Sequence, residues 1–146
     1  MKKLALLIAI VVTTQLSFAN DAPATASPVV KTFNRNFYSA TEVEWQHAEA
    51  YEKVSFLLDK QFMNAYYSPD GELIAVTRNI ISDQLPLKLL LELKKNYSGL
   101  WISELIEVVN GSKDDYYITL ENADEKLILK SKVNKSWKLY QKIVKL

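Results

Sequence analysis

Side chains able to carry out acid–base catalysis are scarce in this chain. His47 is the sole histidine, and the chain contains no cysteine. A histidine that acts as a general base needs a nucleophile and an orienting group within hydrogen-bonding reach. The sequence contains no Gly-x-Ser-x-Gly motif that would present such a nucleophile. We therefore expect His47 to be exposed and non-catalytic, and we predict no catalytic residue.

Metal and cofactor sites have equally little support. Zinc sites use His and Cys ligands in numbers that this chain lacks. The carboxylate clusters, Asp114-Asp115 and Glu121 with Asp124 and Glu125, do not have the spacing of a calcium-binding loop. Three glycines form no phosphate-binding motif. The sequence therefore predicts no metal and no cofactor.

Lysine is the most frequent charged residue near the C-terminus, at positions 126, 130, 132, 135, 138, 142 and 145. If the surrounding segments are strands, Tyr117, Lys130 and Tyr140 fall on the face opposite to Leu127 and Leu129. Such a face could bind an acidic protein or an anionic glycan. The alternative is a solvated sheet face whose lysines prevent edge pairing.

The equivalent outward positions in the first half of the chain are more apolar. Aromatic side chains at such positions suit a binding face, because they bury a large area and have few rotamers to restrict. The same residues could instead pack inside the protein. The candidate protein-binding face consists of Phe62, Tyr66, Ile74, Tyr117, Lys130 and Tyr140.

The first residues have the layout of a secretory signal peptide. Lys2 and Lys3 precede an apolar segment over 4–12, and Ser17-Phe18-Ala19 places small residues at the −3 and −1 positions. The apolar segment is shorter than the roughly 20 residues needed to cross a bilayer. We expect cleavage after Ala19, a flexible lead over 20–27, no membrane span after cleavage, and a periplasmic or secreted location.

The charge balance of the processed chain argues against nucleic acid as a partner. Cleavage removes two of the 18 basic residues and none of the 17 acidic ones, which leaves a formal net charge of −1. A nearly neutral protein has no overall field to hold a polyanion.

The elements that must position these residues follow from local patterns. Ser27-Pro28 is typical of a helix start, and apolar residues then recur at helical spacing to about residue 38. Alternating segments predict four antiparallel strands, with a turn at Pro69-Asp70-Gly71 before the fourth. Pro86 opens a second helix, and four more strands are expected at about 100–109, 114–121, 125–132 and 136–144.

The two halves can be aligned residue by residue. Phe33 falls on Leu93 at an offset of 60, and Val54 falls on Ile118 at an offset of 64. Apolar alternation alone can align unrelated halves in part, but the match over three strands favours duplication. We predict an α+β domain over 28–146, made of two repeats (28–80 and 85–146). Each repeat would be a helix covering one face of a four-stranded antiparallel sheet.

The same residues resemble the PepSY-like, or β-lactamase-inhibitor-like, family of exported bacterial domains. The matching motifs are Phe33 with Phe37, Ala-Thr-Glu-Val-Glu-Trp over 40–45, Tyr51 with Val54 and Phe56, Asp70-Gly71, and Leu85-Pro86 leading to Tyr97. The chain departs from the family pattern in two places. Tyr51 lies three residues before Val54 rather than two, and Asn134-Lys135 replaces an Asp-Gly turn. The resemblance implies protein binding or inhibition across a sheet.

The expected function is therefore an exported, non-enzymatic domain that recognises a protein or peptide through an uncovered sheet face, in an inhibitor-like manner. The alternative is a periplasmic carrier of a small apolar ligand or an envelope glycan. The identity of the partner and the oligomeric state stay open at this point.

Overall fold

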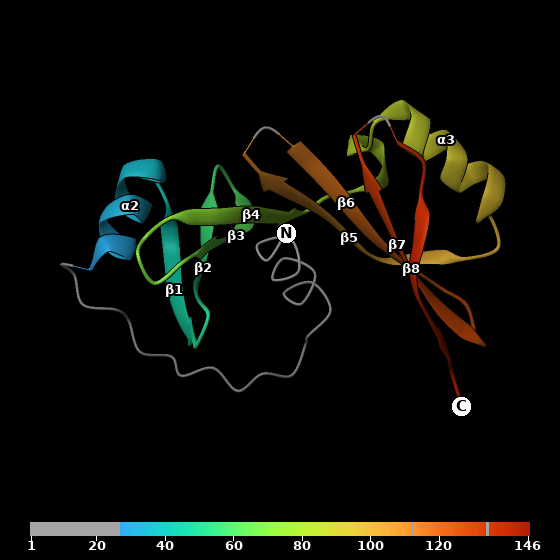
Figure 1. Cartoon of the computed structure of the whole chain (residues 1–146). Coiled ribbons are helices and arrows are strands. Elements are labelled where there is room, and N and C mark those ends of the chain that lie inside the picture. Colours follow the sequence, from blue (N-terminus) through green and yellow to red (C-terminus); the bar gives the residue numbers. More distant parts are fainter. Residues whose placement is uncertain (1–26, 112, 134) are drawn as a thin grey trace. The chain divides into compact units, whose positions relative to one another are not determined.

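Strands dominate the described part of the chain. The computed structural model describes residues 27–111, 113–133 and 135–146, and contains eight strands, two α-helices and a 3₁₀-helix (Figure 1). No helix among these residues is both long and apolar enough to cross a membrane. The predicted signal peptide, its cleavage site after Ala19 and nearly all of the 20–27 lead lie outside the described residues.

The elements in chain order are α2 (Pro28–Asn36), β1 (Thr41–Ala48), β2 (Tyr51–Leu58), β3 (Gln61–Tyr67), β4 (Leu73–Asn79), the 3₁₀-helix η1 (Ser82–Gln84), α3 (Leu87–Asn96), β5 (Trp101–Asn110), β6 (Lys113–Glu121), β7 (Glu125–Lys132) and β8 (Lys138–Val144). This order confirms that the chain is α+β and that four strands follow each α-helix.

The chain divides into two compact units between Val76 and Thr77, which are neighbouring residues of β4. The first unit contains α2, β1 to β3 and the start of β4. The second contains the end of β4, α3 and β5 to β8. Compact units can arise without duplication, so the repeats over 28–80 and 85–146 stay a prediction.

Helix α2 begins where its sequence predicts. The Ser27 Oγ accepts a hydrogen bond from the Val30 backbone N–H at 3.2 Å, which satisfies one of the free donors of the first turn. The helix ends at Asn36, two residues earlier than expected, because Phe37 leaves the helical backbone region with a φ of −133°.

The core of the first unit lies between α2 and the antiparallel strands β1 to β3. Phe33 of α2 is buried, and its ring centroid lies 5.3 Å from that of Trp45 and 5.1 Å from that of Phe56. Val54 and Ala65 are paired across β2 and β3 and are fully buried on the same side. The helix therefore covers one sheet face, as predicted.

The turn before β4 requires glycine at position 71. Gly71 has a φ of +85°, and its backbone N–H donates to the Ser68 carbonyl at 2.9 Å. A Cβ added to Gly71 would lie 2.9 Å from the carbonyl carbon of Pro28. Both the backbone conformation and the close approach of the start of α2 exclude a side chain here.

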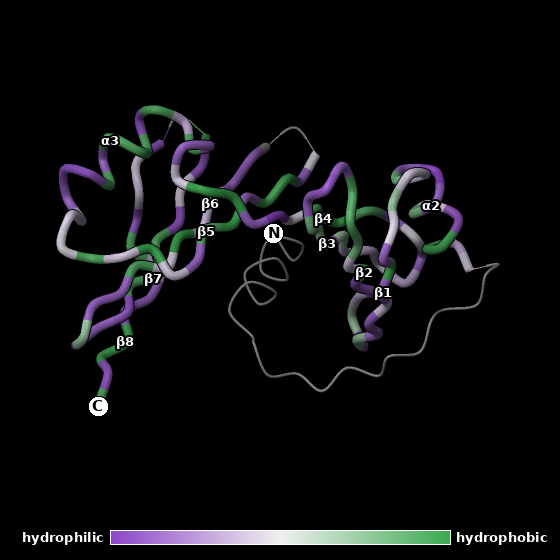
Figure 2. Tube along the Cα trace, turned by 180° about the vertical axis from the view of Figure 1, so that it is seen from behind, coloured by the Kyte–Doolittle hydropathy of each residue, from purple (hydrophilic) through white to green (hydrophobic). Residues whose placement is uncertain are grey.

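The second unit is organised around α3. Leu89 and Leu93 of this helix are buried against a core that includes Ile118 and Leu129. The Trp137 indole N–H donates to the Leu89 carbonyl at 3.1 Å, which ties the segment before β8 to the helix. Figure 2 shows hydrophobic and hydrophilic segments alternating along β6, β7 and β8.

Candidate functional site

The sheet face opposite to α3 carries three of the predicted site residues. Ile118 and Leu129 belong to the core under α3. Their neighbours Tyr117 and Lys130 therefore point to the other face, since successive strand residues alternate. Tyr117 and Lys130 are also direct partners across β6 and β7.

An extra residue in β8 brings Tyr140 next to Tyr117 and Lys130. Leu129 pairs with Leu139, but Ile128 pairs with Gln141, so β8 contains an extra residue at this point. The Tyr140 ring contacts the Tyr117 ring edge to face, with centroids 6.4 Å apart. The structure thus brings Tyr117, Lys130 and Tyr140 together in what we call the Tyr–Lys cluster.

The bulge changes the predicted facing of the residues that follow it. Alternation from Trp137 would place Ile143 on the α3 side and Lys142 on the opposite face. In the structure Ile143 pairs with Lys126, and Lys142 pairs with Leu127. Paired residues share a sheet face, so the extra residue exchanges the two positions.

Lys130 contacts both an aromatic ring and a carboxylate. Its ammonium lies 4.9 Å from the centroid of the Tyr117 ring and 3.5 Å from the Asp115 carboxylate. Burial by itself would lower the pKa of Lys130, but the hydrogen bond with Tyr117 and the charge of Asp115 outweigh it and raise that pKa. Burial also raises the pKa of Tyr117. Both groups therefore keep their usual protonation states at neutral pH.

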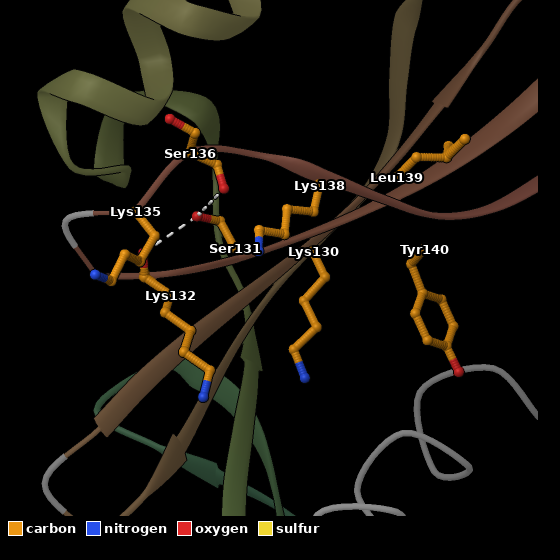
Figure 3. Close-up of a pocket in the computed structure, with 8 residues that line it drawn as sticks. All are labelled: Lys130, Ser131, Lys132, Lys135, Ser136, Lys138, Leu139 and Tyr140. Carbon is orange, nitrogen blue, oxygen red and sulfur yellow. Dashed lines mark hydrogen bonds between the residues drawn. The ribbon is translucent and has the colours of Figure 1, made fainter.

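A pocket adjoins the Tyr–Lys cluster at the β7–β8 hairpin. It has a volume of about 480 Å³ and is lined by Lys130, Ser131, Lys132, Lys135, Ser136, Lys138, Leu139 and Tyr140. Figure 3 shows the side chains of Lys130, Lys132 and Tyr140 extending to the same side of the hairpin. The Ser131 hydroxyl of β7 donates to the Ser136 carbonyl at 3.2 Å, which ties the connection before β8 to β7.

The three site residues predicted in the first unit have different environments. Phe62 is 67% exposed. Tyr66 is buried, and its ring lies 5.7 Å from that of Tyr51. Ile74 is also buried, and it is two residues before Val76, which packs against the core under α2. Ile74 itself is not among the residues of that core, so its place on the predicted face stays a prediction.

The predicted site omitted Tyr51 and the lysines that line the hairpin pocket. Tyr51 lies an odd number of residues before Val54, and this spacing already indicates the face opposite to α2. Lys132, Lys135 and Lys138 belong to the C-terminal lysine series, but only the folded hairpin gathers them around one pocket.

Other chemistry is sparse in the described residues. His47 is exposed, as predicted, and its Nδ1 lies 2.6 Å from a carboxylate oxygen of Glu52. The described residues contain no group of three or more His, Asp or Glu side chains placed to hold a metal ion. A second pocket, near α3 and the start of β5, has a volume of about 170 Å³ and is lined in part by Leu93, Tyr97 and Ile102.

Solved structures with a similar fold come from Bacteroides species. A DUF2874 family protein from Bacteroides ovatus is 17% identical with a TM-score of 0.73, and the match covers 85% of this chain and 89% of that one. A BLIP-like protein from Bacteroides fragilis is 12% identical with a TM-score of 0.70, over 85% of this chain and 87% of that one. A protein of Bacteroides eggerthii described as a candidate periplasmic protein is 13% identical with a TM-score of 0.72, over 85% and 89%.

No protein-family model matches the chain, and no curated protein matches it either. At these sequence identities the likeness establishes the fold, which is BLIP-like. The finer assignment to the PepSY-like family stays a prediction.

Proposed function

We propose that this chain is an exported, non-enzymatic binding domain that recognises a protein or peptide through the sheet face opposite to α3 in the second unit. An inhibitor-like role, in which the bound face of the partner is blocked, belongs to the same proposal. The BLIP-like fold and the resemblance to the PepSY-like family are consistent with it, but neither identifies a partner.

The Tyr–Lys cluster is the observation that carries this proposal. Tyr140 is 39% exposed and contacts the buried Tyr117, so a rigid aromatic pair reaches the surface beside a lysine-lined pocket. Tyrosine is enriched where proteins bind one another, because its ring is apolar and its hydroxyl can still form hydrogen bonds. A partner that covers Tyr140 would bury apolar area at little cost in conformational entropy.

A carrier function has weaker support. The small pocket near α3 holds about 170 Å³, whereas pockets for small molecules usually hold at least about 300 Å³. An apolar ligand would therefore need α3 to move away from the sheet. Native mass spectrometry of the purified protein would detect such a ligand, or a bound glycan, as added mass.

Export is part of the proposal. The amino-terminal pattern is typical of a secretory signal peptide, and a solved protein of the same fold is described as a candidate periplasmic protein. The partner is accordingly expected among periplasmic or secreted proteins.

The test is a quantitative capture of partners from a periplasmic extract by the tagged, processed protein. Replacement of Tyr140 by Ala should reduce the captured amount of a specific partner by about tenfold or more, as expected of a central aromatic contact. Tyr38→Ala is the matched control, since Tyr38 is 90% exposed and lies in the first unit. Equal capture by the two variants would rule out this face as the binding site.

A further inference from the structure

We infer that the pocket at the β7–β8 hairpin binds an extended acidic peptide segment, with carboxylates of that segment placed on Lys132 and Lys138. This inference rests on the proposed function and adds the chemistry of the partner to it.

The first observation is an uneven distribution of counter-charge among the C-terminal lysines. Lys126 pairs with Glu121, Lys142 pairs with Glu125 and Lys145 pairs with Glu121 at 2.8 Å. In contrast, Lys132, Lys135 and Lys138 form no ion pair within the described part of the chain. Each C-terminal lysine outside the pocket thus has a carboxylate partner, while three of the four that line it have none among the described residues.

The second observation is a like-charged pair built into the sheet. Lys130 and Lys138 are direct partners across β7 and β8. Like charges in directly opposite positions destabilise a sheet, and Asp115 supplies only one carboxylate, at 3.5 Å from Lys130. A bound anion would relieve this repulsion, so the hairpin gains stability when the pocket is occupied.

The third observation concerns the shape of the ligand. Lys138 lies opposite Lys130, which is two residues from Lys132 on β7, so Lys132 and Lys138 are about 6.8 Å apart along the strand direction. An extended peptide with acidic residues at alternate positions repeats its carboxylates at the same distance. Strand β8 also comes last in the strand order, and an edge strand can add a further strand by main-chain hydrogen bonds. A peptide can use both features, whereas a glycan can use only the charge.

The volume and lining of the pocket fit such a segment. The 480 Å³ lie within the range of about 300–1,000 Å³ that is usual for ligand pockets. Tyr140 and Leu139 supply apolar contact beside the lysines. The expected motif therefore combines alternate Asp or Glu residues with apolar residues between them.

The experiment measures binding of a fluorescent peptide with Glu at alternate positions and Val between them. The analogue with Gln in place of each Glu is the neutral probe. The double variant Lys132→Gln with Lys138→Gln is compared with the control Lys94→Gln with Lys95→Gln. The control removes the same charge from exposed positions of α3 in the same unit. Circular dichroism verifies that both variants are folded.

The pocket variant should bind the acidic peptide at least roughly tenfold more weakly than wild type, and the control variant should bind it normally. Added salt should weaken binding to wild type far more than binding to the pocket variant. Equal binding by the two variants, equal binding of the Gln peptide, or no binding of the acidic peptide would each overturn the inference.

Two further arms separate this inference from the proposed function. A heparin-derived oligosaccharide that binds wild type more tightly than the peptide would overturn the peptide as ligand in favour of a glycan. If only Tyr140→Ala reduces capture of the partner, and the lysine variant captures it normally, the sheet face stands as the binding site and the acidic ligand is wrong.

Discussion

At the scale of single residues, Glu107 shows how a buried charge is accommodated in the second unit. Glu107 is only 8% exposed, and its carboxylate accepts hydrogen bonds from the Arg78 Nε at 2.5 Å and from the Tyr116 hydroxyl at 3.2 Å. Burial, followed by the charge of Glu107, raises the pKa of Tyr116 to about 12. The three groups form one network, so a change in one of them alters the other two.

Replacement of Glu107 by Gln should lower the pKa of Tyr116 only part of the way from about 12 toward 10, because burial, the largest cause of the shift, remains. The free energy of unfolding should fall by about 1–3 kcal/mol, because Arg78 loses the Glu107 carboxylate. In wild type, Tyr116 ionises near pH 10 when unfolded and near pH 12 when folded. Its contribution to stability is therefore complete below pH 10 and is lost between pH 10 and 12. Urea unfolding at several pH values and the difference in ultraviolet titration between wild type and Tyr116→Phe measure both effects.

Glu104 provides the control for this experiment, since it lies on the same strand and is exposed. Glu104→Gln should leave the titration of Tyr116 and the unfolding midpoint almost unchanged. A normal Tyr116 pKa in wild type would contradict the proposed network.

At the scale of elements, the turns and strand irregularities decide which side chains share a face. The alternation of β6 and β7 correctly predicted that Tyr117 and Lys130 share a face. The pairing of these two strands runs without a register shift from Asp115 to Glu121, so alternation holds throughout. The turn that contains Gly71 leads into β4 and depends on the positive φ of that residue. In β8 the extra residue near Tyr140 places Ile143 on the face opposite to the one that alternation from Trp137 predicts.

Replacement of Gly71 by Ala tests the importance of that turn. A positive φ costs an L-residue roughly 1–2 kcal/mol, and the contact of the new Cβ with Pro28 adds to this loss. Gly111→Ala is the matched control, because Gly111 also has a positive φ, of +66°, but a Cβ added to it would have no heavy atom of the described residues within 4 Å. Urea unfolding should therefore show a larger loss of stability for Gly71→Ala, and equal losses would refute the steric argument.

At the scale of the whole molecule, the predicted export defines where the protein would act. The processed chain is almost neutral, yet its second unit gathers four lysines around one pocket. Selectivity for an acidic partner would then come from a local arrangement of charge, while the small net charge limits long-range attraction to polyanions.

Replacement of Ala19 by Arg tests the predicted processing. Signal peptide cleavage requires a small residue at the −1 position, so the variant should accumulate as the uncleaved precursor. Intact mass spectrometry of the exported protein should find a chain that begins at Asn20 for wild type. A wild-type chain that retains residues 1–19, or normal processing of the variant, would contradict the predicted cleavage site.

The sequence by itself was sufficient for the order of elements, the start of α2, the turn at Gly71 and the α+β class. These features depend on local chemistry, namely capping side chains, apolar periodicity and the backbone freedom of glycine. Only the tertiary structure determined that Tyr117 contacts both Lys130 and Tyr140, and that Lys132 and Lys138 line one pocket. These contacts depend on strand register and on a single extra residue in β8. A shift of one residue moves a side chain to the opposite face, and no local sequence pattern in β8 indicates such a shift.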